Sequence, residues 1–295
     1  MKQIWYLSLC ILILGSCKEK GPYIDLGTDP GISYLAAVES PQSRVVLVEE
    51  FTGVTCSNCP AGHKILAAID SAHPDNVAIV GIQIIGNPQT EPLDNPSVTP
   101  VKTNIDNRTT IGTDLASTIY KQVSGIPSGG VDRVPVSGVL LLGRNDWPGA
   151  VNTRLGTPTK ANISLTKTYV DSIRKVTLKV HVAYTSPVSV RQSLTVALIE
   201  NNVIDAQEFS PTDSPKYVQN YVHKHVLRDI ITPAAGSSML SKLSSIPAGE
   251  VYERTFEYTL PSTVLVPANC AFVVFVSNND GDDKEVVQAA QVNVQ

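Results

Sequence analysis

Two cysteines, Cys56 and Cys59, stand between a strand-like run and a helix-like run, and this arrangement constrains the fold more than any other feature of the chain. Residues 44–51 form an apolar run typical of a buried strand, and residues 61–72 carry apolar side chains at helical spacing. Residues 77–85 form a second, almost continuous apolar run, as in a strand that is covered on both faces. The sequence therefore predicts a β-α-β unit with the two cysteines at the first strand-to-helix turn.

Further elements complete an α/β domain that we expect to cover residues 42–157. A segment rich in Asn, Pro and Thr, residues 86–110, predicts an irregular insertion. After it the pattern favours a helix, a strand and a closing helix, at residues 113–122, 139–142 and 146–155. The Gly-Thr-Pro-Thr sequence at residues 156–159 predicts the domain boundary.

The pattern of polar and apolar residues changes after this boundary. Polar and apolar residues alternate in runs that are separated by turn residues, which is typical of antiparallel strands. The runs that we interpret as strands are residues 161–169, 175–184, 193–200, 251–260, 270–277 and 285–294. We therefore expect residues 158–295 to form an all-β sandwich domain of immunoglobulin-like architecture.

The N-terminal residues are typical of an export signal. Lys2 precedes the apolar run of residues 4–14, which is shorter than the roughly 20 residues that a transmembrane helix needs. Leu14-Gly15-Ser16-Cys17 resembles a bacterial lipobox, in which acyl chains such as palmitate are attached to the cysteine. We therefore predict a signal peptide over residues 1–16, and a lipidated Cys17 followed by a flexible tether up to residue 41. A plain signal peptide with a chance cysteine is the alternative.

Composition narrows the class of protein. Hydrophobic residues make up 42% of the chain and charged residues 17%, which excludes a disordered or coiled-coil protein. The net charge is -4 and no long run of one sign occurs, so binding to nucleic acid is not expected. Removal of Cys10 with the signal peptide and acylation of Cys17 would leave Cys56, Cys59 and Cys270 as possible thiols. Export favours oxidation of the closely spaced pair.

A C-x-x-C pair at the start of a helix has a definite chemical use. The free N–H groups and the dipole of the helix stabilise a thiolate there. Cys56 would be the exposed nucleophile, Cys59 would resolve the mixed disulfide, and Glu50 would accept the proton of Cys59. The alternative is a static disulfide that only holds the turn together.

The segment from Val48 to Cys59 resembles the active-site strand and turn of the thioredoxin superfamily. Ile126-Pro127-Ser128 resembles the cis-proline segment of the same superfamily. The resemblance implies a thioredoxin-like domain in which Glu50 assists proton transfer and Pro127 lines the substrate groove. Thr55 stands where an aromatic residue commonly precedes the first cysteine, and this departure weakens the expected substrate surface.

A second resemblance extends over most of the chain. Residues 49–62, 221–228 and 285–290 are similar to the outer membrane protein 28-related lipoproteins of Gram-negative bacteria. This resemblance implies a lipid-anchored thioredoxin-like domain followed by a β-sandwich, with no particular substrate.

Weaker signals point to metals or to ordinary structure. Cys56, Cys59 and His63 could start a zinc or copper site, and His223 and His225 would share one face of a strand. The run 278–283 has the oxygen-rich side chains of a calcium loop but is mainly a hairpin signal, and Cys270 fits a buried core position. An oxidised cysteine pair cannot bind a metal, and no carboxylate-rich partner for the two histidines is evident. The sequence contains no metalloprotease, serine hydrolase or P-loop motif, and we expect no metal and no cofactor.

The sequence as a whole predicts an envelope lipoprotein of the outer membrane that exchanges thiols and disulfides with exported proteins. Its predicted partners are the membrane, through Cys17, and exported proteins with thiols or disulfides. A binding or structural lipoprotein whose Cys56–Cys59 disulfide is static is the alternative. The sequence predicts neither the oligomeric state nor the face of the membrane.

Overall fold

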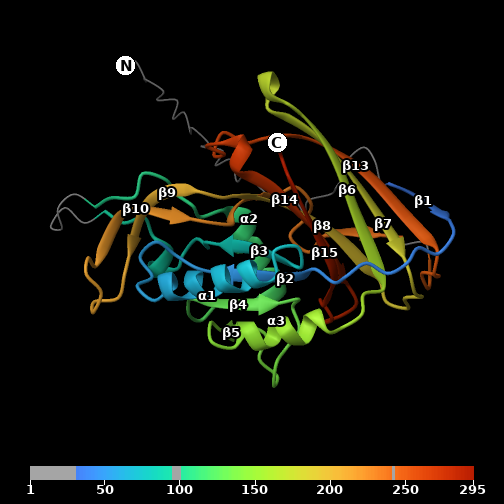
Figure 1. The fold of residues 1–295 in the computed structure, drawn as a ribbon, viewed down its shortest axis with the longest axis horizontal. Helices are drawn as coiled ribbons and strands as arrows, with labels where there is room; N and C mark the ends of the chain where they lie inside the picture. Colours follow the sequence, from blue (N-terminus) through green and yellow to red (C-terminus); the bar gives the residue numbers. More distant parts are fainter. Residues whose placement is uncertain (1–30, 95–100, 241–242) are drawn as a thin grey trace, which may run out of the picture.

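A computed structural model describes residues 31–94, 101–240 and 243–295 of the chain (Figure 1). The predicted signal peptide, the predicted lipidated Cys17 and most of the predicted tether lie outside these residues. Within them the protein is mostly β. The described strands form a nine-stranded sheet, a four-stranded sheet and a separate two-stranded hairpin. No helix among the described residues has both the length and the apolar character to cross a bilayer.

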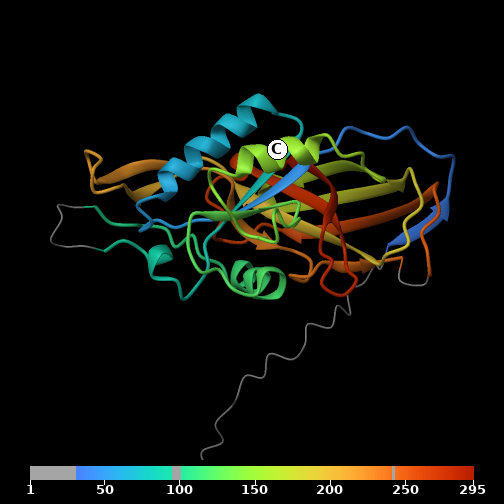
Figure 2. The same cartoon turned by 90° about the horizontal axis from the view of Figure 1, so that it is seen from below.

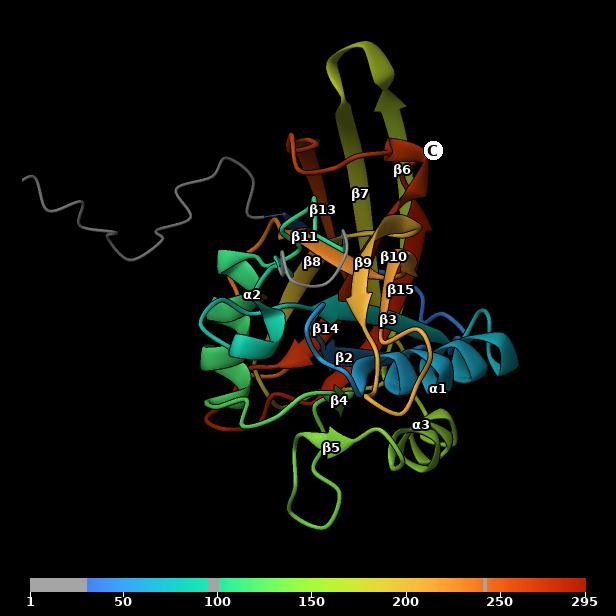
Figure 3. The same cartoon turned by 90° about the vertical axis from the view of Figure 1, so that its left-hand side faces the viewer.

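The first half of the chain contributes one end of the large sheet, with helices on both faces. Its strands lie in the order β3-β2-β4-β5, with β2 parallel to β3 and antiparallel to β4. Helices α1 and α3 cover one face, and α2 with the π-helix η2 covers the other (Figures 2 and 3). The bounds are β2 Val46–Phe51, α1 Cys59–Ala72, β3 Val77–Ile82, η1 Pro88–Thr90, α2 Thr110–Leu115, η2 Ala116–Tyr120, β4 Ser128–Val131, β5 Leu142–Gly143 and α3 Trp147–Leu155.

Strand β2 is buried on both faces, and its alternation assigns each side chain to a layer. Val46 and Val48 pack in the cluster beneath α1 and α3, which also contains Trp147. Leu47 and Phe51 pack in the cluster on the other face, which contains residues of α2 and η2. Because successive side chains of a strand point in opposite directions, the neighbours Glu49 and Glu50 must face different layers.

The second half of the chain forms a β-sandwich, as the alternating pattern predicted. The four-stranded sheet, in the order β1-β13-β7-β6, faces β8 and β14 of the large sheet across an apolar core. Phe272, Leu198 and Leu178 are among the fully buried side chains of this core. The bounds are β1 Ile32–Leu35, β6 Ala161–Val170, η3 Asp171–Ile173, β7 Lys175–Tyr184, β8 Gln192–Glu200, β9 Val203–Glu208, β10 Tyr217–His223, β11 Val226–Ile230, β12 Ser237–Met239, β13 Glu250–Thr259, η4 Pro267–Asn269, β14 Cys270–Asn278 and β15 Val286–Asn293.

The two halves share the large sheet, whose order is β15-β14-β8-β11-β3-β2-β4-β5 with β12 paired to β8. They meet where β11 joins β3 in a parallel contact between Val226 and Gly81. The backbone of Val286 on β15 also donates to Asp132 after β4, at 2.8 Å. The boundary predicted at residue 158 falls between α3 and β6, but the sheet itself continues across it.

Some local predictions differ from the structure. Residues 32–35, predicted as part of the tether, form β1 and pair with β13, because the edge of β13 offers free backbone groups. The predicted strand 139–142 is reduced to Leu142–Gly143, since the preceding residues bend into a turn closed by Val136 and Val139. Between the predicted strands 193–200 and 251–260, the chain forms four further strands, β9 to β12.

Candidate functional site

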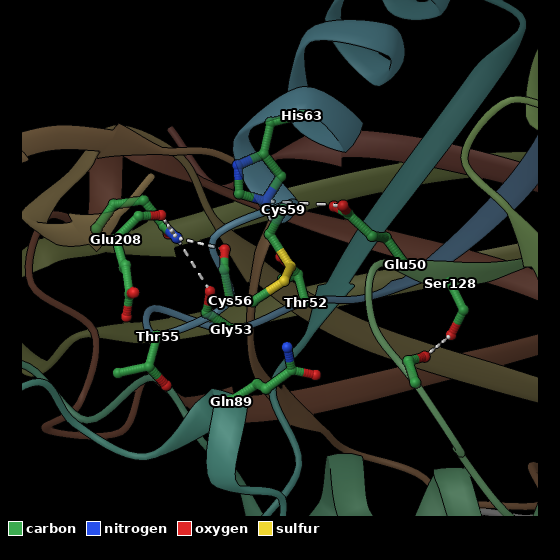
Figure 4. Close-up of a disulfide and its surroundings, with 12 residues drawn as sticks. Glu50, Thr52, Gly53, Thr55, Cys56, Cys59, His63, Gln89, Ser128 and Glu208 are labelled. Atoms are coloured by element: carbon green, nitrogen blue, oxygen red, sulfur yellow. Dashed lines mark hydrogen bonds and ion pairs between the residues drawn. A yellow bond between two sulfur atoms is a disulfide. The ribbon is translucent and has the colours of Figure 1, made fainter. Parts of the chain in front are cut away.

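Cys56 and Cys59 form a disulfide at the turn between β2 and α1 (Figure 4). Helix α1 begins at Cys59, and its first turn contains Pro60, whose missing N–H costs nothing at that position. Asn58, which precedes the helix, makes no side-chain capping bond. The first N–H groups of α1 thus lack a side-chain cap, the setting that favours a thiolate.

The expectation that Cys56 is exposed was wrong. Both cysteines have 0% exposure. Their side chains belong to the apolar cluster that also contains Phe51 and Ile126. Strand β9 of the two-stranded hairpin holds the backbone of the turn, because Gln207 donates from Nε2 to the carbonyl oxygens of Gly53 and Cys56, both at 3.2 Å. The backbone N–H of Glu208 donates to the carbonyl of Val54, at 2.8 Å. The sequence signal for an active-site turn is local, and it contains no information about a hairpin that is formed by distant residues.

A second segment closes the turn from the side of η1. The N–H of Thr55 donates to the carbonyl of Gln89 at 3.1 Å, and the Thr55 hydroxyl donates to the carbonyl of Pro88 at 3.0 Å. A Cβ at Gly53 would collide with the carbonyl of Gln89, so only glycine fits there. The cysteine turn is therefore held between η1 on one side and the β9–β10 hairpin on the other.

Glu50 lies on the α1 face of the sheet, as alternation requires, and only 4% of it is exposed. A Cβ at Gly62 of α1 would lie 3.3 Å from Glu50 Oε1 and 3.3 Å from Pro127 Cβ, so this glycine lets the helix approach both residues. The peptide bond between Ile126 and Pro127 is cis. Burial raises the pKa of Glu50 to about 8, so this carboxyl group is mostly protonated at neutral pH.

Glu49 faces the opposite layer and has a different partner. Arg133 donates to both carboxylate oxygens of Glu49, at 2.7 and 2.8 Å, and the Tyr120 hydroxyl donates to Oε2 at 2.6 Å. A Cβ at Gly130 would collide with that hydroxyl, so this position excludes a side chain. Glu49 is thus an anchored buried anion, whereas Glu50 is a buried acid near the cysteine turn.

His63 connects Glu50 to the hairpin. Its Nε2 lies 2.8 Å from the Thr52 hydroxyl and 3.7 Å from Glu50 Oε1, and its Nδ1 lies 2.7 Å from the Tyr221 hydroxyl. Burial lowers the pKa of His63 to about 3, with smaller contributions from His223 and His225. Because His63 is neutral and Glu50 is mostly protonated at neutral pH, their contact is not an ion pair.

The two histidines that were expected to share one face of a strand are arranged differently. His223 ends β10, while His225 lies in the following turn with a positive φ of 56°, so they do not share a strand face. Burial lowers the pKa of each to about 4. Among the described residues, no three His, Cys, Asp or Glu side chains are placed so as to hold a metal ion.

The other two candidate positions have structural roles. The run 278–283 forms the turn between β14 and β15, where Asp280 pairs with Arg191 and Asn278 donates to Asp283. The polar side chains of this run therefore pair with neighbouring residues of the hairpin and of the segment before β8. Cys270 is a free cysteine with 1% exposure, and burial raises the pKa of its thiol to about 12, which makes it a core residue.

Sequence reasoning missed two residues of this site, Gln207 and Tyr221. Both lie in the β9–β10 hairpin, whose short polar strands have no strong periodicity. Tyr221 opens one of the segments on which the family resemblance rests, and that was the only signal that pointed to it.

The fold and the site define a β-rich protein with a covered disulfide at a strand-to-helix turn. The model of the family described as outer membrane protein Omp28 matches residues 115–295, more than half of the chain. The chain therefore belongs to the Omp28 family, whose description places it among outer membrane proteins. No curated protein matches the chain.

One solved structure supports the fold. The chain is similar to HBP35 of Porphyromonas gingivalis, with a TM-score of 0.60 and 15% identity over 86% of this chain and 76% of that one. At this identity the likeness concerns the fold alone. A domain of the outer membrane lipoprotein Omp28 from the same organism matches 46% of this chain and 88% of its own length, with 18% identity and a TM-score of 0.28. A protein from Agrobacterium tumefaciens matches 86% of this chain and 96% of its own, with 14% identity and a TM-score of 0.46.

Proposed function

We propose that this chain is a lipid-anchored envelope protein in which the Cys56–Cys59 pair exchanges thiols and disulfides with exported proteins. The observation that carries the proposal is the disulfide at the start of α1, with the buried acid Glu50 and the cis Pro127 both in contact distance of Gly62 one turn further on. Such a combination suits a reactive pair, because the helix stabilises the thiolate of Cys56 and the acid supplies a proton for Cys59.

The architecture around the pair supports a thioredoxin-like unit. The order β3-β2-β4-β5, the antiparallel β4 and β5 and the helices on both faces agree with the resemblance described for the sequence. Pro127 directly precedes β4, as the resemblance implies for the cis-proline segment. The exchange role of Cys56, Cys59, Glu50 and Pro127 is part of this proposal, as are the signal peptide and the acylation of Cys17.

One observation favours the alternative, a binding or structural lipoprotein with a static disulfide. Both cysteines are fully buried, and Gln207 of the hairpin bonds to the backbone of their turn, so we expect an incoming thiolate to reach Cys56 only after local movement. Exchange therefore requires a population of molecules in which the hairpin has opened locally. Such openings are common in proteins and cost less than global unfolding.

The reduction potential of the pair in the mature chain tests the proposal. Glutathione buffers of known ratio, followed by alkylation and mass measurement, give the fraction of reduced protein. We expect a potential above about -300 mV, the range in which exchange proteins work. A potential below that bound, with alkylation only after global unfolding, would replace the proposal with the static disulfide.

Loss of the anchor is tested separately. Replacement of Cys17 by Ala should move the protein from the membrane fraction to the soluble fraction, because acyl chains supply the membrane affinity. Retention of the variant in the membrane fraction after washing at high salt would contradict the anchor.

A further inference from the structure

Glu50 presents a problem that the exchange reaction alone does not solve. When a thiolate attacks Cys56, the sulfur of Cys59 leaves as a thiolate and takes the proton of Glu50. Glu50 must then regain a proton, yet its side chain is only 5% exposed. Its Oε1 atom makes no hydrogen bond within the part of the chain that the structure describes. A route to solvent is therefore required.

His63 and Tyr221 follow this carboxyl group in a chain of polar contacts, and the exposed fraction of the side chain rises from 5% at Glu50 to 20% at His63. His63 Nε2 is 3.7 Å from Glu50 Oε1, and His63 Nδ1 is 2.7 Å from the Tyr221 hydroxyl. Tyr221 itself is partly exposed. A neutral imidazole can accept a proton at one nitrogen while it releases a proton from the other, so this ring suits a transfer in either direction.

A cavity of about 180 Å³ lies beside these groups. It is lined by Glu50, His63 and Tyr221, and also by His225, whose Nδ1 atom is buried and makes no hydrogen bond among the described residues. A cavity of this size with polar groups on its wall has room for water. A single water molecule there would bridge the 3.7 Å between Glu50 Oε1 and His63 Nε2.

Burial keeps the His63 imidazole neutral at neutral pH, and charged groups line the cavity beside it. Lys64 and Asp70 line it from α1, and Lys224 lines it from the turn after β10. The remaining titratable neighbours are Tyr221, His223 and His225, and burial lowers the pKa of both histidines to about 4. None of these histidines is charged at neutral pH, so none opposes the arrival of a proton.

We propose that His63 and Tyr221 form the proton route between Glu50 and solvent. The proposal rests on the proposed function. In the reductive direction, an attacking thiolate bonds to Cys56 and the bond between Cys56 and Cys59 breaks. Cys59 takes the proton of Glu50, and the Glu50 carboxylate then accepts the Nε2 proton of His63. His63 Nδ1 accepts the hydroxyl proton of Tyr221, and Tyr221 regains a proton from solvent, so one proton enters for each one that Cys59 gains. Oxidation of the pair runs the same transfers in reverse and restores the starting tautomer of His63.

The exchange of the Glu50 carboxyl proton with deuterium tests the route directly. After dilution of the oxidised mature chain into D2O, the infrared carbonyl band of the protonated carboxyl shifts, and its rate of shift reports the exchange. Loss of the band in Glu50→Gln assigns it. We expect Tyr221→Phe to slow the exchange by about tenfold, because the variant removes one hydroxyl group and keeps the ring contacts with Phe209 and His223.

Tyr217→Phe is the matched control. Tyr217 lies on the same strand, β10, but its ring contact is with Lys216 and not with His63. We expect this variant to exchange at the rate of the unaltered protein. Equal rates in the unaltered chain and in Tyr221→Phe would overturn the route through Tyr221, and equal slowing by both tyrosine variants would assign the effect to the hairpin as a whole and would overturn it too.

The exchange measurement separates this inference from the proposed function. It uses the disulfide form and needs no thiol chemistry, so a slower exchange in Tyr221→Phe supports the route whatever the reduction potential of the pair. A potential below about -300 mV together with slowed exchange would remove the proposed function and leave the proton route in place.

Discussion

The cover over Cys56 is the feature whose removal should change the chemistry most. Gln207 is fully buried, and its Nε2 makes two hydrogen bonds to the cysteine turn, at 3.2 Å to Gly53 and at 3.2 Å to Cys56. Replacement by Ala removes both bonds and leaves two carbonyl oxygens without these donors. At about 1 kcal/mol for each bond, the closed state loses about 2 kcal/mol relative to the open state.

The lower stability of the closed state should make the disulfide react faster. Since about 1.4 kcal/mol corresponds to a tenfold change, Gln207→Ala should raise the population of the open state about 30-fold. If reduction requires opening, the rate at which dithiothreitol reduces the Cys56–Cys59 bond should rise by about the same factor. The assay is alkylation of aliquots at timed intervals, followed by measurement of the mass of the intact chain.

Gln219→Ala provides the control on the same hairpin. Gln219 is partly exposed and bonds to the backbone of Lys102, away from the cysteine turn. It should change the reduction rate by less than about threefold, because exposed hydrogen bonds contribute little. An unchanged rate in Gln207→Ala, together with a measurable loss of global stability, would refute the idea that Gln207 restricts access to Cys56.

Two further perturbations test the buried charges. Burial raises the pKa of Glu50 in the folded state from its ordinary value of 4.5 to about 8, so between these pH values the folded state holds a proton that the unfolded state lacks. Stability should therefore fall as pH rises through this window, by up to about 1.4 kcal/mol per pH unit, and Glu50→Gln should abolish this component. Urea unfolding at about pH 6 and about pH 9 gives the change in the free energy of unfolding between the two pH values. The same change in the unaltered protein and in Glu50→Gln would contradict this prediction. Arg133→Met should cost about 3 kcal/mol or more, because it leaves the Glu49 carboxylate buried without its cation. Lys175→Met, which removes the exposed ion pair with Glu257, should lower the free energy of unfolding by less than about 1 kcal/mol in the same assay. Similar losses in Arg133→Met and Lys175→Met would refute the idea that burial makes the Glu49 pair the more costly one to break.

Much of the fold could be predicted because its core strands carry strong local patterns. The predicted strands 161–169 and 175–184 became β6 and β7 with bounds within one residue. Helix α1 was predicted from its apolar spacing, although it begins at Cys59 rather than two residues later. Pattern reasoning works here because each of these elements buries one face or both faces along its full length.

The arrangement between these elements was beyond such reasoning. The contact that joins β3 to β11 brings Gly81 next to Val226, which is separated from it by about half of the chain. The side on which Glu50 lies follows from alternation along β2, which is a local rule. Gln207 was missed because it acts from a hairpin whose position depends on long-range packing. The same packing reversed the expected exposure of Cys56.

The hairpin therefore decides what the cysteine pair can do. The Cys56–Cys59 disulfide closes a loop of only four residues and therefore stabilises the fold by only about 2 kcal/mol. This small gain in stability does not by itself explain why the disulfide is so completely buried. The hairpin forms its own two-stranded sheet, so it can move without breaking a strand pairing of the large sheet. It supplies both Gln207, which donates to the backbone carbonyl of Cys56, and Tyr221, which bonds to His63. Because both residues belong to one hairpin, we expect access to the disulfide and the proton supply of Glu50 to depend on the same element.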